Sequence, residues 1–223
     1  MTMEQEICDS PSDLGSRRVF LSAGIPEADW IDAPFQRHEI TQAVVTVARA
    51  VLAANGSLVF GGHPLITPLV FDVAGRILNG QEGKSDRVIL YQSTYFTDAL
   101  PEAVWNFRNA PWASVNDVPG TEHMEESLVR MREEMIASKP QLAAAIFIGG
   151  KPGVIAEYNL VRQTLPTIKM YPFKRPGGAS ANLSPHNAGS TIAEELATSA
   201  AYWALARHVV ADIAANEIRT QSE

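Results

Sequence analysis

The residues best suited to chemistry lie in one stretch of the chain, which runs from Leu142 to Glu157 and reads LAAAIFIGGKPGVIAE. Its apolar residues, 142–148, stand before a glycine pair and predict a short, buried parallel strand that ends in a tight turn. A helix is then predicted to begin near Pro152 or Gly153. Because a helix start presents unpaired backbone N–H groups and the positive end of the helix dipole, this turn predicts an anion site, most often one for phosphate.

Glu157 lies one turn into this predicted helix. Its carboxylate is expected beside the anion, where it accepts a hydrogen bond from a ribose hydroxyl or works as an acid or a base. The alternative is a plain strand-to-helix turn with an acidic residue matched to the helix dipole, because glycine-rich turns are common. From these residues alone, both interpretations remain open.

A second glycine pair, Gly61 and Gly62, follows another short predicted strand and is followed in turn by His63. Thr67 is predicted to cap the next helix, which has a proline at its first position. His63 is expected either to donate a hydrogen bond to a phosphate or only to fill space at the turn.

Arg132 belongs to a predicted helix at 121–138. The apolar stripe of this helix consists of Met124, Leu128, Met131 and Met135. At roughly 100° per residue, Arg132 lies about 60° from the centre of the stripe and Arg130 about 140° from it. Arg132 is therefore expected at the edge of the core and Arg130 in solvent. A partly buried arginine needs an anionic partner, which is either a bound ligand or an acid such as Glu125 or Glu133.

The rest of the chain alternates between predicted strands, at 17–23, 57–60, 87–91 and 166–171, and predicted helices. The first helix, at 35–54, has a buried stripe of Ile40, Val44, Val47 and Val51. A capping box of Thr191 and Glu194 is predicted to start the last helix. Its expected buried face consists of Ile192, Leu196, Trp203, Val210 and Ile213.

Two long segments interrupt this alternation. Residues 92–120 hold aromatic residues among prolines and acids, and they are expected to form a lid, a subunit contact or an excursion that only covers the core. Residues 172–189 are expected to be a mobile polar loop that closes over a ligand, or else an exposed linker.

Five strand-to-helix units in succession predict an α/β fold whose parallel sheet has at least five strands and helices on both faces. Ligands of such sheets bind beyond the carboxyl ends of the strands, where the strand order reverses. The residues at the predicted carboxyl ends are Gly24, Gly61, Gly62, Ser93, Gly149 and Gly150. We expect them to converge on one crevice that binds a nucleotide-like ligand.

Length and composition narrow the alternatives. The 223 residues, 46% of them apolar, are enough for one α/β domain with an insertion at about 92–120, and the polar segment 1–16 is expected to be a tail. The net charge of −7 argues against nucleic acid or a membrane surface as a partner.

The single cysteine, Cys8, provides neither a disulfide framework nor a cysteine metal site within the chain, and the histidines show no metal-ligand spacing. We therefore expect no metal and no cofactor. No apolar run approaches the length of a membrane span, and the N-terminus is acidic where a signal peptide is basic. A cytoplasmic location is expected.

The motifs GGHPLITPLV at 61–70 and IGGKPGVIAE at 148–157, together with SLVRMREEM at 127–135, resemble the SLOG superfamily, which includes the "lonely guy" phosphoribohydrolases. The chain looks most like the branch associated with Sir2 and TIR domains in bacterial conflict systems. The likeness extends from Arg17 to about Asn216, and it implies a single nucleotide-binding domain at 17–216 followed by a tail at 217–223. It implies a Rossmann-like three-layer αβα sandwich and a homodimer or higher homo-oligomer.

The resemblance implies two activities. Enzymatic members cleave the N-glycosidic bond of a nucleoside 5′-monophosphate with an arginine and the glutamate of a P-G-G-x-G-T-x-x-E motif. Glu157 matches that glutamate, and Arg132 is a near match for the arginine. This chain departs from the motif at Ile148, at an extra residue after Gly150, and at Val154, which replaces the threonine. The first motif also departs, with His63 and Ile66 at two of its positions.

Members of the Sir2- and TIR-associated branch instead sense NAD-derived nucleotides such as cyclic ADP-ribose isomers. No Sir2 or TIR domain fits in this chain, so a sensor would act through a separate partner or through its oligomeric state. The two hypotheses are thus an ADP-ribose-like nucleotide sensor and a phosphoribohydrolase in which Glu157 and Arg132 are catalytic. The predicted ligand-binding residues are Ser22, Gly24, Gly61, Gly62, His63, Ser93, Arg132, Gly149, Gly150, Lys151, Gly153, Val154 and Glu157.

Overall fold

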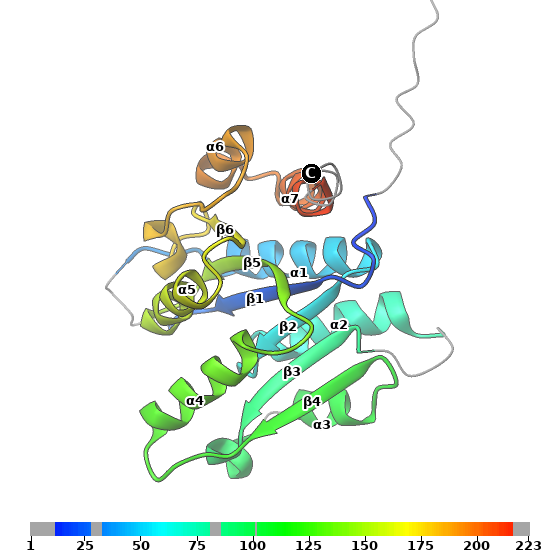
Figure 1. Cartoon of the computed structure of the whole chain (residues 1–223), viewed down its shortest axis with the longest axis vertical. Helices are drawn as coiled ribbons and strands as arrows, with labels where there is room; N and C mark the ends of the chain where they lie inside the picture. The colour runs from blue at the N-terminus through cyan, green and yellow to red at the C-terminus, as the bar shows by residue number, and fades with distance from the viewer. Residues whose placement is uncertain (1–11, 28–32, 81–85, 101, 216–223) are drawn as a thin grey trace, which may run out of the picture.

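The computed structural model describes residues 12–27, 33–80, 86–100 and 102–215 (Figure 1). Its centre is a sheet of parallel strands in the order β4-β3-β2-β1-β5-β6. The strands are β1 (Arg18–Gly24), β2 (Ser57–Gly61), β3 (Val88–Ser93), β4 (Ala113–Val118), β5 (Leu142–Gly149) and β6 (Lys169–Phe173). The predicted α/β class is confirmed, and this sheet has six strands in its described part.

Helices cover both faces of this sheet, so the molecule is a Rossmann-like sandwich of three layers. The helices are α1 (Arg37–Ala53), α2 (Thr67–Leu78), α3 (Glu102–Asn109), α4 (Met124–Ile136), α5 (Pro152–Thr164), α6 (Ser190–Thr198) and α7 (Tyr202–Ala214), and the short 3-10 helices are η1 (Thr94–Ala99) and η2 (Ala179–Asn182). None of the helices among the described residues has both the length and the apolar character needed to cross a bilayer.

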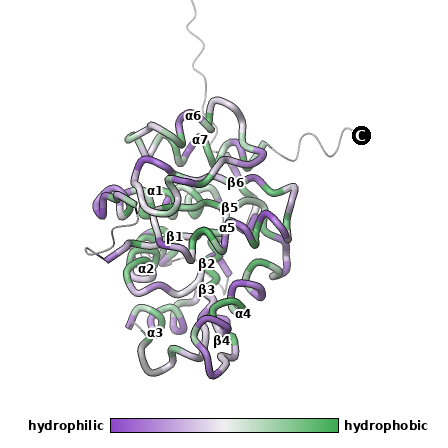
Figure 2. Tube along the Cα trace, turned by 90° about the vertical axis from the view of Figure 1, so that its left-hand side faces the viewer, coloured by the Kyte–Doolittle hydropathy of each residue, from purple (hydrophilic) through white to green (hydrophobic). Residues whose placement is uncertain are grey.

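Two buried clusters join the layers. The first packs residues of α1, α2, α3 and α7 against one face of the sheet, and the second packs residues of α4 and α5 against the other. Strand β5 contributes side chains to both clusters. Ile146 belongs to the first cluster and its neighbour Phe147 to the second, because successive side chains of a strand point to opposite faces. Figure 2 shows the corresponding pattern, with apolar residues along the central strands and hydrophilic ones along the outer turns.

The strand order reverses between β1 and β5. From β1 the chain adds β2, β3 and β4 on one side, and it then returns to add β5 and β6 on the other. β1 and β5 are paired along their length up to Gly24 and Gly149. Their carboxyl ends therefore form the switch point at which a parallel sheet binds its ligand.

The segment at 92–120, predicted to be an insertion, contains η1, α3 and the edge strand β4. β4 escaped prediction because its sequence, ASVNDV, is polar and mostly half-buried at the edge of the sheet. Phe107 and Trp112 of this segment are buried in the core, whereas Trp105 is 51% exposed.

Two predicted N-cap residues are wrong, although both helices begin within two residues of the predicted starts. Ile66 stands at the N-cap position of α2, and Thr67 is its first residue, whose hydroxyl accepts a hydrogen bond from the His63 N–H at 3.0 Å. The capping box of Thr191 and Glu194 does not form, because α6 begins at Ser190 after Gly189 and shows no side-chain cap.

The predicted last helix is two helices, α6 and α7, and Trp203 is not on its buried face. Trp203 is 62% exposed, while its neighbour Tyr202 is 2% exposed. The helix is interrupted at Ser199, whose hydroxyl accepts a hydrogen bond from the Ala201 N–H at 3.1 Å. This interruption changes which residues of the second helix face the core.

The segment at 172–189 is not an exposed linker, because part of it is buried; its closure over a ligand stays a prediction. Ser180 is fully buried, and its hydroxyl donates to the Phe173 carbonyl at 2.8 Å. The Ala179 N–H donates to the Gly150 carbonyl at 2.9 Å. This loop therefore packs behind the glycine turn that follows β5.

Candidate functional site

A hollow of about 520 Å³ lies at the carboxyl ends of β1, β2 and β5, in the size range of small-molecule sites. The structure brings most of the predicted ligand-binding residues to it. Those that line the hollow are Gly24, Gly61, Gly62, His63, Arg132, Gly150, Lys151, Gly153, Val154 and Glu157. The convergence expected from the two glycine pairs is thus observed.

Three predicted residues do not line the hollow. Ser93 is fully buried, and its hydroxyl accepts the Tyr95 N–H at the start of η1. Ser22 and Gly149 lie beneath the surface of the hollow and hold residues that line it.

The glycine turn after β5 does not present the bare amides that its sequence predicts. The Gly149 N–H donates to the Ser180 hydroxyl at 2.8 Å, and the Gly150 N–H donates to the Gly24 carbonyl at 2.7 Å. Among the described residues, the structure gives no hydrogen-bond partner to the backbone N–H groups of Lys151 and Gly153. The free donors therefore lie one to three residues further on, at the start of α5, where the helix dipole adds to them.

The turn needs glycine at its first position. Gly149 has a φ of +64°, and a Cβ there would lie 2.6 Å from the Gly24 carbonyl oxygen and 2.7 Å from Cδ1 of Ile40. This close approach holds the ends of β1 and β5 together and directs the chain into α5.

Glu157 forms the buried polar centre of the hollow. Its Oε1 lies 3.3 Å from Nε of Arg132, and its Oε2 accepts a hydrogen bond of 2.5 Å from the Ser22 hydroxyl. The side chains of Glu157 and Arg132 are each only 15% exposed. Arg132 therefore pairs with Glu157 rather than with Glu125 or Glu133, and Ser22 positions the carboxylate from below.

The position of Arg132 depends on Gly153. A Cβ at Gly153 would lie 3.0 Å from Nη2 of Arg132, so the guanidinium stands directly over the first turn of α5. A planar guanidinium with spare N–H groups beside unpaired helix amides is suited to bind a phosphate.

Burial raises the pKa of Glu157 above its ordinary value of 4.5, and the opposing effects of the Ser22 hydrogen bond and of the Arg132 charge are smaller. A carboxyl group of this kind retains its proton at a higher pH than an exposed glutamate does. It can therefore donate a proton as well as accept a hydrogen bond.

This raised pKa predicts a pH dependence of stability. Relative to the variant Glu157→Gln, the wild type is expected to be most stable below pH 4.5, and to lose that advantage as the pH rises through the raised pKa of Glu157, because the buried carboxylate must then ionise. Thermal unfolding of both proteins between about pH 4 and pH 8, followed by circular dichroism, measures the difference.

The variant Glu134→Gln controls for the loss of a charge, because Glu134 is a half-exposed carboxylate of α4 paired with Arg130. An advantage of the wild type that grows with pH would contradict the prediction. It would mean that the ion pair with Arg132 outweighs the cost of burial.

His63 offers a neutral donor at the mouth of the hollow. Its Nδ1 accepts the Leu65 N–H at 3.2 Å, which assigns the ring proton to Nε2 in the neutral tautomer. Burial lowers the pKa of His63, so the neutral ring is favoured. Nε2 lies 3.5 Å from the Cβ position of Gly24, so it is directed toward the end of β1.

The opposite wall of the hollow is apolar, and its residues were predicted to lie in the core. Met131 and Met135 of the α4 stripe are buried, and Met131 also lines the hollow. Met124 is 44% exposed and lines the hollow together with Leu128, and Glu125 of the same helix lies beside them. Stripe periodicity alone does not distinguish a core from a pocket wall, so the sequence held no signal for this difference. A wall of flexible thioether and leucine side chains suits a flat base or a ribose.

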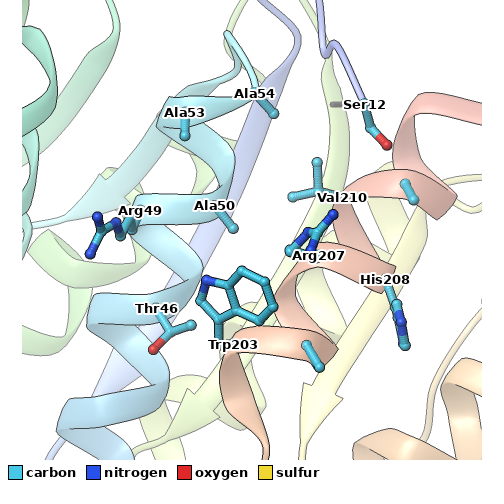
Figure 3. Close-up of a pocket in the computed structure, with 12 residues that line it drawn as sticks. Ser12, Thr46, Arg49, Ala50, Ala53, Ala54, Trp203, Arg207, His208 and Val210 are labelled. Carbon is cyan, nitrogen blue, oxygen red and sulfur yellow. The ribbon is translucent and has the colours of Figure 1, made fainter. Parts of the chain in front are cut away.

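A second hollow, of about 490 Å³, lies between α1 and α7 (Figure 3). Trp203 forms its wall with the guanidinium of Arg207, whose central carbon lies 4.7 Å from the ring centroid. Its floor consists of small residues of α1 such as Ala50. None of the predicted site residues lies there, and neither glycine turn borders it. Among the described residues, no group of His, Cys, Asp or Glu side chains is arranged to hold a metal ion.

The model of the SLOG cluster3 family matches residues 35–210. The match contains both glycine motifs, Arg132 and Glu157. No curated protein matches the chain.

Proposed function

Because the chain belongs to the SLOG cluster3 family, we propose that it binds a nucleotide derived from NAD, or a related ADP-ribose-like molecule, in the hollow at the start of α5. One observation carries this proposal: the residues with unpaired amides, Lys151 and Gly153, line the same hollow as the guanidinium of Arg132, which stands over Gly153 at the switch point of the sheet. Helix amides, a positive dipole end and a guanidinium are the groups that bind phosphate in proteins.

The contacts of the hollow support one orientation of the ligand. Its phosphates bind to the helix start and to Arg132, and Glu157 accepts a hydrogen bond from a ribose hydroxyl. The base packs against Met124 and Leu128, which have no polar atoms that would require a partner. His63 donates to a phosphate oxygen or to the ribose from the side of β2.

In this proposal the protein acts in the cytoplasm as a sensor in a bacterial signalling or defence system. A separate TIR or Sir2 protein, or a change between homo-oligomeric states, transmits the signal. Family membership supports the nucleotide-related role, and the contacts described above support the choice of pocket.

Isothermal titration calorimetry with ADP-ribose, AMP, NAD and adenosine tests the proposal. Phosphate-bearing ligands are expected to bind at least tenfold more tightly than adenosine, because one charge-assisted hydrogen bond contributes about 1.5–3 kcal/mol. The proposal is overturned if none of the phosphate-bearing ligands binds at millimolar concentration, or if adenosine binds as tightly as they do.

A second function, hydrolysis of a nucleoside 5′-monophosphate, is favoured by the raised pKa of Glu157 beside Arg132. In this reaction the oxygen of water bonds to the anomeric carbon as the N-glycosidic bond breaks. The departing base takes up one proton, which replaces the proton that water releases. Glu157 accepts that proton or donates one to the base, and Arg132 stabilises the phosphate.

Incubation with AMP and chromatography for free adenine test this second function. If the protein is a hydrolase, Glu157→Gln is expected to lower the rate of adenine release at least 100-fold, in line with the loss of a general acid or base. An unchanged rate in this variant would contradict the role of Glu157. If the wild type releases no adenine, AMP hydrolysis is excluded. The proposed binding function is then tested by the calorimetry alone.

A further inference from the structure

Among the described residues, the two cations that line the hollow at the start of α5, Arg132 and Lys151, are each paired with a carboxylate of the chain itself. Arg132 pairs with Glu157 inside the hollow. Lys151 pairs with Glu27, whose Oε2 lies 2.6 Å from the lysine Nζ. The two pairs join elements that are distant in sequence, because Glu27 follows β1 whereas Lys151 precedes α5.

The two pairs differ in how firmly they are held. Glu157 is buried and has a second hydrogen bond, from the Ser22 hydroxyl. The side chains of Lys151 and Glu27 are 43% and 65% exposed, and Glu27 accepts no further side-chain hydrogen bond from a described residue. An ion pair this exposed is weak, since water and salt screen it. A bound anion can therefore displace Glu27 from Lys151 far more easily than it can displace Glu157 from Arg132.

The position of Lys151 makes this displacement relevant to the ligand. Lys151 is the residue before α5, its backbone N–H is one of the two unpaired donors, and its side chain lines the hollow. His63 is also close enough to Glu27 to interact with its charge. Thus the Glu27 carboxylate binds the same ammonium that a ligand phosphate would reach from the helix start.

We propose that Glu27 is a built-in competitor of the ligand's phosphate, which holds Lys151 until a phosphate replaces it. The inference rests on the proposed nucleotide-binding function. It adds a selection rule to that function. A phosphate group takes the place of Glu27 as the partner of Lys151. An uncharged nucleoside leaves Glu27 in place and gains no contact with the lysine. Lys151 thereby favours phosphorylated ligands over their dephosphorylated products, and Glu27 lowers the affinity with which the phosphorylated ligands bind.

Calorimetry of ADP-ribose binding to wild type, Glu27→Gln, Lys151→Met and the double variant tests this inference. Glu27→Gln is expected to tighten binding about fivefold, because Lys151 is then free for the phosphate. Lys151→Met is expected to weaken binding. In the Lys151→Met background, the further change Glu27→Gln is expected to alter affinity less than twofold, because the ammonium for which Glu27 and the phosphate compete is absent.

The matched control is Asp72→Asn, which removes another exposed, ion-paired carboxylate, on α2, and is expected to leave ADP-ribose affinity within twofold. If Glu27→Gln binds no more tightly than wild type, or gains as much without Lys151 as with it, the competition is disproved while the proposed function stands. If neither wild type nor Glu27→Gln binds ADP-ribose, the proposed ADP-ribose site is itself disproved, and the inference with it.

Discussion

The free energy of unfolding of the variant Gly149→Ala is expected to be about 4 kcal/mol lower than that of the wild type. A left-handed backbone conformation costs an alanine roughly 1–2 kcal/mol, and overpacking typically adds about 1–3 kcal/mol. At this residue φ is +64° and the new Cβ would lie 2.6 Å from a backbone oxygen of Gly24, which cannot rotate away. Urea denaturation followed by circular dichroism measures the loss.

Gly80→Ala separates the two causes. Gly80 also has a positive φ, of +90°, but a Cβ there would meet no atom of the described residues within 4 Å. This variant is expected to lose only the conformational part, about 1–2 kcal/mol. If Gly149→Ala lost no more than Gly80→Ala, the ends of β1 and β5 would not approach as closely as described, and the geometry of the turn into α5 would be in error.

Arg132→Met is expected to weaken ADP-ribose binding about 30-fold. Among the described residues, Arg132 is the less exposed of the two cations that line the hollow, with its side chain 15% exposed against 43% for Lys151. A charge-assisted hydrogen bond contributes about 1.5–3 kcal/mol, which corresponds to roughly 10- to 150-fold in affinity. Methionine retains much of the apolar stem, so the change removes the charge while α4 keeps its packing. Titration calorimetry gives the affinity, and circular dichroism confirms the fold.

Arg130→Met is the matched control on the same helix. Arg130 pairs with Glu134 in solvent, with the two side chains about half exposed, and does not line the hollow. Its loss is expected to change affinity less than twofold. Equal losses in the two variants would show that a general reduction in positive charge, rather than a contact of Arg132, weakens binding.

Much of the fold and of the site followed from local patterns in the sequence. Apolar runs bounded by glycines predicted β1, β2 and β5, and the parallel order implied that their carboxyl ends meet, which brought Gly24, Gly61 and Gly150 to one hollow. Helical periodicity separated Arg132 from Arg130 correctly. These inferences succeeded because they depend on local apolar runs, on the common direction of parallel strands and on helix geometry.

The errors concern contacts between distant parts of the chain. The N–H groups of Gly149 and Gly150 donate hydrogen bonds to Ser180 and to Gly24, and the sequence of the turn does not reveal these partners. Met124 has the same periodicity as Met135, yet one lines a hollow and the other is buried. Such differences depend on which element packs opposite, and no local pattern encodes that.

The central claim is that the start of α5 holds the phosphate of a nucleotide. Titration of the isotope-labelled protein with ADP-ribose, followed by amide resonances in two-dimensional NMR spectra, tests it directly. We predict that the N–H signals of Lys151 and Gly153 shift most, because these donors gain a partner. Unchanged signals at both residues, with the largest shifts instead at Ala50 and Ala204 in the hollow beside Trp203, would contradict the claim.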